Sequence, residues 1–224
     1  MMSTKDSSET VNQKPRTLRL VWPQWQGAGM ESIRKFFSEV PFEEARRGYA
    51  VGAAVLNAVL WIDSHPDVGT PASKYSGYHA MAIAVLTGNG DPDVLRLLPA
   101  TLDPARVALV GLHSWTEDDF PNIARWGIRS FRPEDLHLSS QPLLDWLKAS
   151  GCSCFAIHFD VDVVDSNEIV FGLGADVDGL TSNEARRLVA DVSAISDVVG
   201  LTIAEFIPRQ VIRLQQVLRD FPLI

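Results

Sequence analysis

Cysteine is scarce in this chain, and no stretch of it is strongly basic or strongly apolar. The 224 residues contain two cysteines, Cys152 and Cys154, which argues against a disulfide framework and against a cysteine-rich zinc site. The net charge is −8 and no basic stripe is present, so nucleic acid is not expected as a partner. The longest apolar stretch, residues 49–62, is interrupted by Gly52 and Asn57 and is too short to span a bilayer. We therefore expect no membrane partner either.

The composition, 46% hydrophobic and 21% charged, is typical of a soluble globular protein. A length of 224 residues is consistent with one large α/β domain. The first sixteen residues are polar and lack the apolar core of a signal peptide. The sequence therefore predicts a disordered tail at residues 1–16, a single domain at residues 17–224 and a cytoplasmic location.

Short apolar runs alternate with amphipathic segments along the chain. They predict strands at 18–21, 59–62, 107–111, 128–131, 155–159 and 198–204, and helices at 43–56, 118–126, 143–149, 182–195 and 209–219. The helix at 182–195 opens with Thr181-x-x-Glu184, a capping-box pattern. This alternation predicts an α/β fold, a three-layer doubly wound parallel sheet with helices on both faces. Ligands bind beyond the carboxyl ends of the strands in such sheets.

Two acidic runs follow predicted strands nearly a hundred residues apart. Asp63, His65 and Asp67 follow the strand at 59–62, and Asp160 and Asp162 follow the strand at 155–159. Either run alone fits an ordinary strand-exit loop or a solvated turn, because Asp is favoured in turns. Carboxylates at the ends of buried strands are costly to desolvate unless a cation compensates them. Together the two runs offer enough hard ligands for two divalent metals and favour a metallohydrolase.

These motifs resemble those of the arginase and agmatinase family, the ureohydrolases. Residues 61–67 resemble the family's Asp-Ala-His-x-Asp motif. Residues 158–166 resemble its Ser-x-Asp-x-Asp-x-x-Asp-Pro motif, with histidine in the first position and serine in the last. Residues 76–79 resemble the segment that carries a proton-shuttling histidine, and residues 179–181 resemble a Gly-Gly-Leu-Thr helix start. Glu205 stands where the family has a glutamate that contacts substrate.

The resemblance implies a binuclear metal site. Asp63 and Asp160 would bridge two metals, Asp67 would complete one site, and His65 with Asp162 would complete the other. A ligand set dominated by carboxylates suits Mn²⁺ better than Zn²⁺.

The resemblance also implies an arginase-like fold and the hydrolysis of a guanidino compound to urea and an amine. His79 would give a proton to the leaving amine, Glu205 would orient the guanidinium, and Ser76 would also bind substrate. A homo-oligomer is implied as well. His113 and His158 flank the predicted site and are interpreted as supporting or structural residues.

Several family features are not in this sequence. The Gly-Gly-Asp-His motif, which supplies a further metal ligand, is not found. In the family this motif lies before the strand that leads into Asp-x-His-x-Asp. Here the predicted helix at 43–56 runs almost directly into the strand at 59–62. This abrupt junction indicates that an internal segment is missing there. Gly69 stands where arginases have an asparagine, and His113-Ser114-Trp115 replaces an acidic stretch. These changes disfavour arginine as the substrate.

Two alternatives stay open at this point. One is an impaired family member that binds metal weakly and acts by association. The other is a deacetylase-like hydrolase, which has the same general fold but uses a single zinc. That enzyme needs Asp-x-His and one further aspartate, and the additional Asp67 and Asp162 favour two metals instead.

Overall fold

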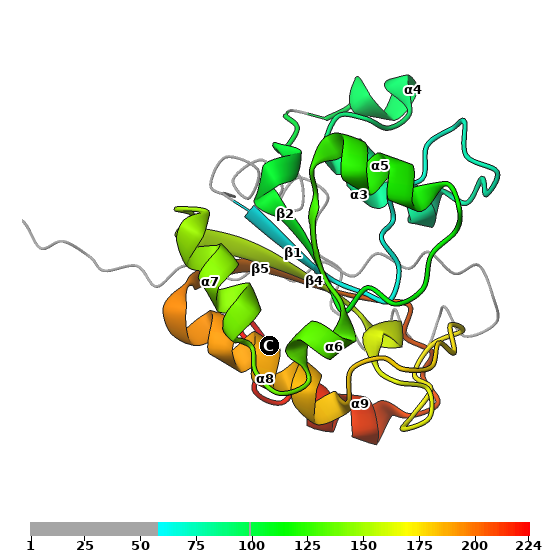
Figure 1. Ribbon diagram of the computed structural model, residues 1–224. Helices are drawn as coiled ribbons and strands as arrows, with labels where there is room; N and C mark the ends of the chain where they lie inside the picture. The colour runs from blue at the N-terminus through cyan, green and yellow to red at the C-terminus, as the bar shows by residue number, and fades with distance from the viewer. Residues whose placement is uncertain (1–57, 99) are drawn as a thin grey trace, which may run out of the picture. The chain divides into compact units, whose positions relative to one another are not determined.

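A computed structural model describes residues 58–98 and 100–224 of the chain (Figure 1). The predicted tail at 1–16, the strand at 18–21, the helix at 43–56 and the abrupt junction after that helix lie outside the described residues. The division of the chain into a tail and one domain from residue 17 therefore stays a prediction.

Strands and helices alternate along the described chain, as the sequence predicted. In chain order the elements are β1 (Ala58–Ile62), η1 (Tyr78–Met81), α3 (Ala82–Leu86), α4 (Pro92–Leu95), η2 (Pro104–Arg106), β2 (Val107–Val110), α5 (Asp119–Trp126), β3 (Arg129–Phe131), α6 (Pro133–Leu136), α7 (Gln141–Ala149), β4 (Cys154–Asp160), η3 (Val161–Val163), α8 (Ser182–Ile195), β5 (Asp197–Ala204) and α9 (Val211–Leu218).

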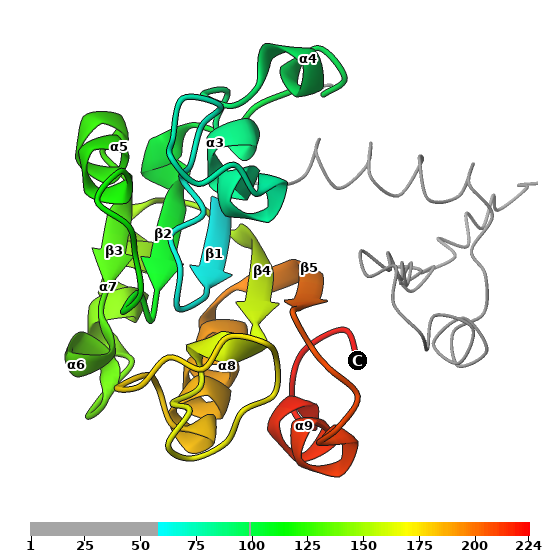
Figure 2. The same cartoon turned by 90° about the vertical axis from the view of Figure 1, so that its right-hand side faces the viewer.

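The described strands form one five-stranded sheet in the order β3-β2-β1-β4-β5, and every neighbouring pair is parallel (Figure 2). The chain passes from β1 outward to β2 and β3, and then returns to place β4 on the other side of β1. The direction of winding therefore reverses between β1 and β4. In parallel α/β sheets this reversal opens a crevice at the carboxyl ends of the two strands, where ligands bind.

Helices cover both faces of the sheet. Helices α3 and α5 lie on one face, and α6, α7 and α8 lie on the other (Figure 1). Parallel crossover connections are right-handed, so a chain that winds first one way and then the other places its helices on opposite faces. The predicted doubly wound α/β architecture with helices on both faces is confirmed.

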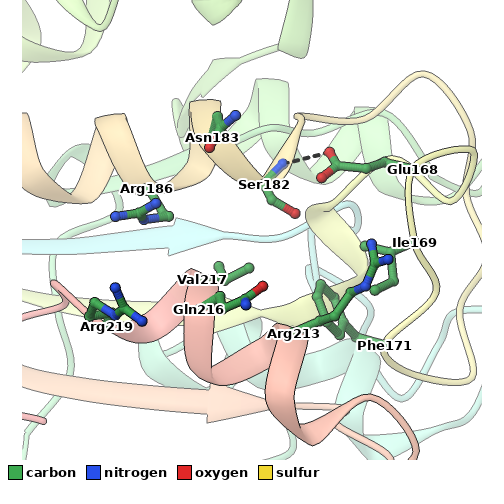
Figure 3. A pocket seen from close by; sticks show the side chains of 10 residues that line it. All are labelled: Glu168, Ile169, Phe171, Ser182, Asn183, Arg186, Arg213, Gln216, Val217 and Arg219. Carbon is green, nitrogen blue, oxygen red and sulfur yellow. Dashed lines mark hydrogen bonds between the residues drawn. The ribbon is translucent and has the colours of Figure 1, made fainter.

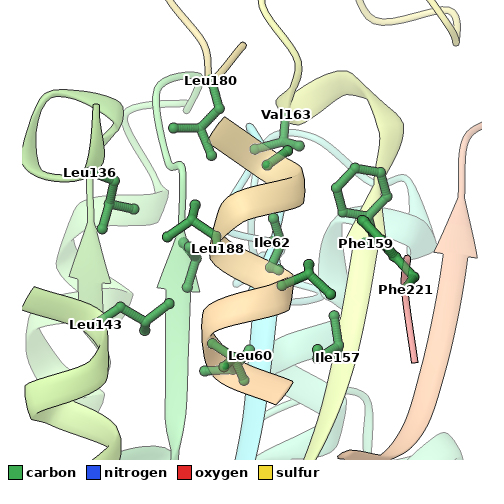
Figure 4. Close-up of a cluster of buried hydrophobic side chains, with 14 of the residues drawn as sticks. Leu60, Ile62, Leu136, Leu143, Ile157, Phe159, Val163, Leu180, Leu188 and Phe221 are labelled. Atoms are coloured by element: carbon green, nitrogen blue, oxygen red, sulfur yellow. The ribbon is translucent and has the colours of Figure 1, made fainter. Parts of the chain in front are cut away.

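The larger hydrophobic core lies between the sheet and helices α7, α8 and α9 (Figure 4). Side chains alternate along a strand, so Leu60 and Ile62 of β1 and Ile157 and Phe159 of β4 point into this core. Leu188 of α8 packs among them and is fully buried.

A smaller core covers the opposite face of β1 and β2. Val107 and Leu109 of β2 pack there against Ile83 of α3 and Ile123 of α5, with Trp61 of β1 at the edge. The same face of β4 and β5 is less covered by the described residues, and it carries polar side chains close to the strand ends. This difference between the two halves of the sheet matters for the site.

Helix α8 begins where the capping box predicted. Thr181 Oγ1 accepts a hydrogen bond from the Glu184 amide at 3.2 Å, and Glu184 Oε2 accepts one from the Thr181 amide at 2.8 Å. The two bonds satisfy amide groups that a helix start leaves without partners. The predicted range 182–195 matches the helix.

Other predicted boundaries differ by one or two residues. The last helix begins at Val211 and not at residue 209, because Pro208 and Arg209 form a turn and Gln210 is the cap. The short helices η1, α3, α4 and α6 were not predicted as separate elements, since four or five residues carry too few apolar positions to show a helical period. Among the described helices, none is long and apolar enough to cross a membrane.

Leu188→Ala tests the larger core. The side chain is fully buried between α8 and the sheet, so its truncation should lower the free energy of unfolding by about 2–5 kcal/mol. Urea denaturation followed by circular dichroism measures this change. Leu138→Ala is the matched control, because Leu138 is 97% exposed and its loss should change stability by less than about 0.5 kcal/mol. Equal effects from the two substitutions would contradict the assignment of the core.

Candidate metal centre

Two buried aspartates mark the carboxyl ends of the strands at the reversal point. Asp63 directly follows β1, and Asp160 is the last residue of β4. The register pairs Ile62 with Phe159, so Asp63 and Asp160 are next to each other on neighbouring strands. Each carboxylate folds the following loop back on itself: Asp63 Oδ1 accepts the His65 amide at 2.7 Å, and Asp160 Oδ1 accepts the Asp162 amide at 3.0 Å. The two acidic runs therefore meet at one place in the sheet.

Hydrogen bonds join the two loops. The Ser64 hydroxyl donates to Asp162 Oδ1 at 2.8 Å, and the Ser64 amide donates to the same oxygen at 3.4 Å. His65 Nδ1 lies 3.3 Å from Asp162 Oδ2 and 3.6 Å from Asp63 Oδ1. Residues from the loop after β1 and the loop after β4 thus form one connected polar cluster.

The cluster contains two groups of side chains that could each hold a metal ion. One group is Asp63, His65 and Asp162, and the other is Asp63, His158 and Asp160; within each, one ligand atom per residue lies within 4.8 Å of the others. Asp63 belongs to both groups. This arrangement is suited to two cations that share a carboxylate.

The carboxylates carry altered proton affinities because they are buried close together. Burial raises the pKa of Asp63 to about 6, against hydrogen bonds from His65. Burial, and then repulsion by Asp63 and Asp162, raises the pKa of Asp160 to about 10. Burial and repulsion also raise the pKa of Asp67 well above its usual value.

The pKa values of Asp162 and His65 shift in the direction opposite to the one that burial alone would give. Burial alone would raise the pKa of Asp162, but hydrogen bonds from His65 and Ser64 outweigh it and hold that pKa below its usual value. Burial would lower the pKa of His65, but its contacts with Asp162 and Asp63 raise it to about 11. Without a cation, therefore, protons partly neutralise the negative charge of this cluster.

Asp67 lies near the cluster but outside both ligand groups. Its backbone is left-handed, with φ at 47°, and its carbonyl oxygen accepts the Ile83 amide at 3.0 Å. A residue other than glycine in this conformation is strained, and such residues concentrate at functional sites. The Asp67 carboxylate is close enough to Asp63 for their repulsion to contribute to its raised pKa.

The other predicted site residues have no hydrogen bond or ion pair with the cluster in the part of the chain that the structure describes. Ser76 and His79 are exposed in the loop and short helix after β1, where His79 Nε2 lies 3.0 Å from the Tyr75 hydroxyl. Glu205 is exposed beyond the end of β5, and its backbone is left-handed with φ at 57°. Their predicted roles stay predictions.

Two residues near the cluster were not among the predicted ligands. His158 belongs to one ligand group, and its position two residues before Asp160 in a strand, hence on the same face, was the available signal. Asp176 Oδ2 lies 3.7 Å from His65 Nε2. A long loop brings Asp176 to the cluster, and nothing in the local sequence pattern indicates that.

A hollow of about 350 Å³ lies elsewhere, between the start of α8 and helix α9 (Figure 3). Arg186, Arg213 and Arg219 line it, and none of the predicted site residues does. Its positive charge makes it unsuitable for a cationic guanidinium.

The raised pKa of Asp160 predicts a pH effect on the stability of the metal-free protein. The folded chain keeps the proton of Asp160 up to about pH 10, whereas the unfolded chain releases it near the ordinary value of 3.8. The folded state therefore binds more protons, and stability should fall between about pH 7 and pH 9, with Asp160 contributing up to about 1.4 kcal/mol per pH unit. His65 acts in the same direction, because its pKa is also raised on folding.

Urea denaturation with a chelator present measures this slope. Asp160→Asn should make it shallower, and Asp145→Asn, which changes an exposed residue of α7, should leave it as it is. The same slope in Asp160→Asn and in the unchanged protein would show that Asp160 does not carry the proton.

Comparisons with known proteins point to one family. The sequence profile described as "Arginase family" matches residues 47–216. The arginase of Entamoeba histolytica is 25% identical over 156 residues, which cover 67% of this chain and 52% of that protein. The arginase of Staphylococcus aureus strain MRSA252 is 26% identical over 157 residues, with the same coverage. The chain thus spans about half the length of these curated relatives.

Solved structures show the same fold. The arginase of Bacillus subtilis has a TM-score of 0.66 at 21% identity, covering 79% of this chain and 68% of that one. The arginase of Bacillus caldovelox has a TM-score of 0.65 at 21% identity, covering 72% of this chain and 56% of that one. The sequence resemblance is confirmed, and because the profile matches more than half of its residues, this chain belongs to the arginase family.

Proposed function

We propose that this chain is a binuclear manganese hydrolase of the ureohydrolase type, which converts a guanidino compound to urea and an amine. The observation that supports this most is the position of Asp63, a buried carboxylate shared by two groups of potential metal ligands at the carboxyl ends of β1 and β4. Membership of the arginase family supports the reaction class.

The residues present fit a divalent metal. Asp63, Asp160 and Asp162 are buried, and three carboxylates so close together are costly to keep charged without a cation. The donor set is rich in oxygen with few imidazoles, which favours Mn²⁺ over Zn²⁺. Bound divalent cations would supply the Lewis acidity that activates water for attack on a guanidinium carbon.

We assign the ligands as the resemblance implies. Asp63 and Asp160 would be shared by the two cations, and His65 with Asp162 would hold one of them. Asp67 would hold the other, and its carboxylate is close enough to Asp63 for their repulsion to raise its pKa. A single-zinc, deacetylase-like site would not need both Asp67 and Asp162, whereas a site with two metals would use both.

We assign the substrate contacts to three exposed residues outside the cluster, as the resemblance implies. Glu205, beyond the end of β5, would accept charge-assisted hydrogen bonds from the guanidinium. The backbone at Glu205 requires a glycine at position 172, because a Cβ there would lie 2.6 Å from the Glu205 carbonyl oxygen. His79, beside the Tyr75 hydroxyl, would give a proton to the leaving amine, and Ser76 would contact the substrate.

The loop after β1 disfavours arginine. At Gly69 a Cβ would lie 2.7 Å from the Ala80 carbonyl oxygen, so the loop leaves no room for an asparagine there. His113, Ser114 and Trp115 likewise offer no carboxylate to an α-amino group. We therefore propose a guanidino substrate without an amino-acid head group. Cytoplasmic location and assembly into a homo-oligomer stay predictions from the sequence.

Metal stoichiometry tests the shared carboxylates. Calorimetric titration of the metal-free protein with Mn²⁺ should show two unequal sites, the tighter one at His65 and Asp162, because the family's Gly-Gly-Asp-His ligand is not in the sequence. Asp160→Asn should abolish both sites, and Asp162→Asn should weaken only the tighter one. Asp145→Asn is the control and should bind as the unchanged protein does. Two equally tight sites, or two mutants that keep full metal content, would contradict the assignment.

Urea release from a panel of guanidino compounds tests the activity. With arginine, agmatine, guanidinobutyrate and guanidinopropionate, we expect slow Mn²⁺-dependent turnover that prefers a compound other than arginine. The polar groups that would position an amino-acid head are missing, and each 1.4 kcal/mol or so of lost transition-state stabilisation costs about tenfold in rate. Rapid turnover with arginine preferred would contradict this preference. No urea from any compound, with both metals bound, would favour the impaired family member.

A further inference from the structure

His158 lies in a row of side chains across three strands, just below the buried carboxylates. The parallel register pairs Trp61 of β1 with His158 of β4, and His158 with Thr202 of β5. Because side chains alternate along a strand, His158 shares its face of β4 with Asp160. The imidazole is therefore directed to the same face as the ligand that we assign as bridging.

Contacts on two sides hold the ring in place. The His158 ring is stacked on the Trp61 indole, with 3.6 Å between ring centroids and 9° between the planes. His158 Nδ1 lies 2.7 Å from Thr202 Oγ1. The Trp61 indole nitrogen in turn donates to Asp63 Oδ2 at 2.9 Å, which orients that carboxylate toward the imidazole. A ring fixed in this way has its other nitrogen, Nε2, in a defined position.

The spacing around Nε2 fits a shared cation. His158 Nε2 lies 3.9 Å from Asp63 Oδ2, which is too long for a hydrogen bond. Ligand atoms about 2.0–2.2 Å from one first-row divalent cation lie about 3.0–4.4 Å from each other. The ligand atoms of Asp63, His158 and Asp160 all lie within 4.8 Å of one another, so small side-chain movements would bring the three onto one ion.

Both nitrogens of His158 are explained by such an ion. In the tautomer whose Nδ1 donates its proton to Thr202 Oγ1, Nε2 carries a lone pair 3.9 Å from Asp63 Oδ2. Beside an ionised carboxylate this lone pair is repelled, and a proton or a cation between the two groups removes the repulsion. In metal-binding histidines the N–H of the second ring nitrogen commonly donates to an oxygen, and this bond fixes the tautomer. Thr202 Oγ1 is that oxygen here.

We propose that His158 is a metal ligand of this chain. Through Nε2 it would bind one of the two divalent cations that Asp63 and Asp160 share, the one that we assign to Asp67. This inference rests on the metal centre of the proposed function and adds a ligand to it. The sequence has no Gly-Gly-Asp-His motif, and His158 stands where the resemblance gives a serine. The imidazole thus gives the cation that we assign to Asp67 a nitrogen ligand that it would otherwise lack.

Calorimetric titration with Mn²⁺ is the first test. The unchanged protein should bind at two sites, and His158→Gln should lose the weaker one or weaken it at least tenfold, with the site at His65 and Asp162 within about twofold of its original affinity. His137→Gln is the matched control, because His137 is exposed and lies beside Glu184 of α8. It should leave both sites as they are.

Pulsed electron paramagnetic resonance distinguishes ligation from support of the fold, because it detects the nitrogen of an imidazole bound to Mn²⁺. In His65→Gln the imidazole signal should persist through His158, and in the double substitution with His158→Gln it should disappear. Since His65→Gln keeps His158 and its stacking on Trp61, this measurement decides the matter even if His158→Gln folds poorly.

The outcomes separate the two proposals. An unchanged protein that binds no Mn²⁺ would overturn the metal centre and this inference with it. Two Mn²⁺ sites of unchanged affinity in His158→Gln, or no imidazole signal in metal-loaded His65→Gln, would overturn the role of His158 alone and leave the proposed function in place.

Discussion

Repulsion between buried carboxylates is the constraint on which the rest of this structure depends. Asp63, Asp160 and Asp162 are forced together because β1 and β4 are neighbours at the reversal point of the sheet. Ionised, they would be costly to bury, and the raised pKa values of Asp63 and Asp160 show that protons relieve part of this cost. A divalent cation would relieve it more completely. The acidic loops, the half-buried His158 and the strained backbone at Asp67 all fit a structure built around that compensation.

Most of the described fold was predictable from sequence because its elements are strongly patterned. The runs at β1 and β4 are nearly continuous in apolar residues, as expected of strands buried inside a parallel sheet. The capping box of Thr181 and Glu184 fixed the start of α8. The four- and five-residue helices between β1 and β2 were missed, because so short a segment depends on tertiary packing more than on its own periodicity.

The site was predictable only in part. Asp63, His65, Asp160 and Asp162 could be predicted as potential metal ligands because each lies within a few residues of a strand end. His158 was interpreted as a supporting residue, since its stacking on Trp61 and its bond to Thr202 depend on the register between three strands, which no single run reveals. The same limit applies across the long loops that separate His79 and Glu205 from the carboxylates.

The most direct measurement of the central claim is anomalous X-ray diffraction at the manganese edge, from crystals grown with Mn²⁺. The account predicts two anomalous peaks at the carboxyl ends of β1 and β4, one on either side of Asp63. His65 and Asp162 should contact one peak, Asp67 and His158 the other, and Asp63 and Asp160 both. No peak at these strand ends, with the carboxylates free of metal in crystals that hold Mn²⁺ elsewhere, would contradict the account.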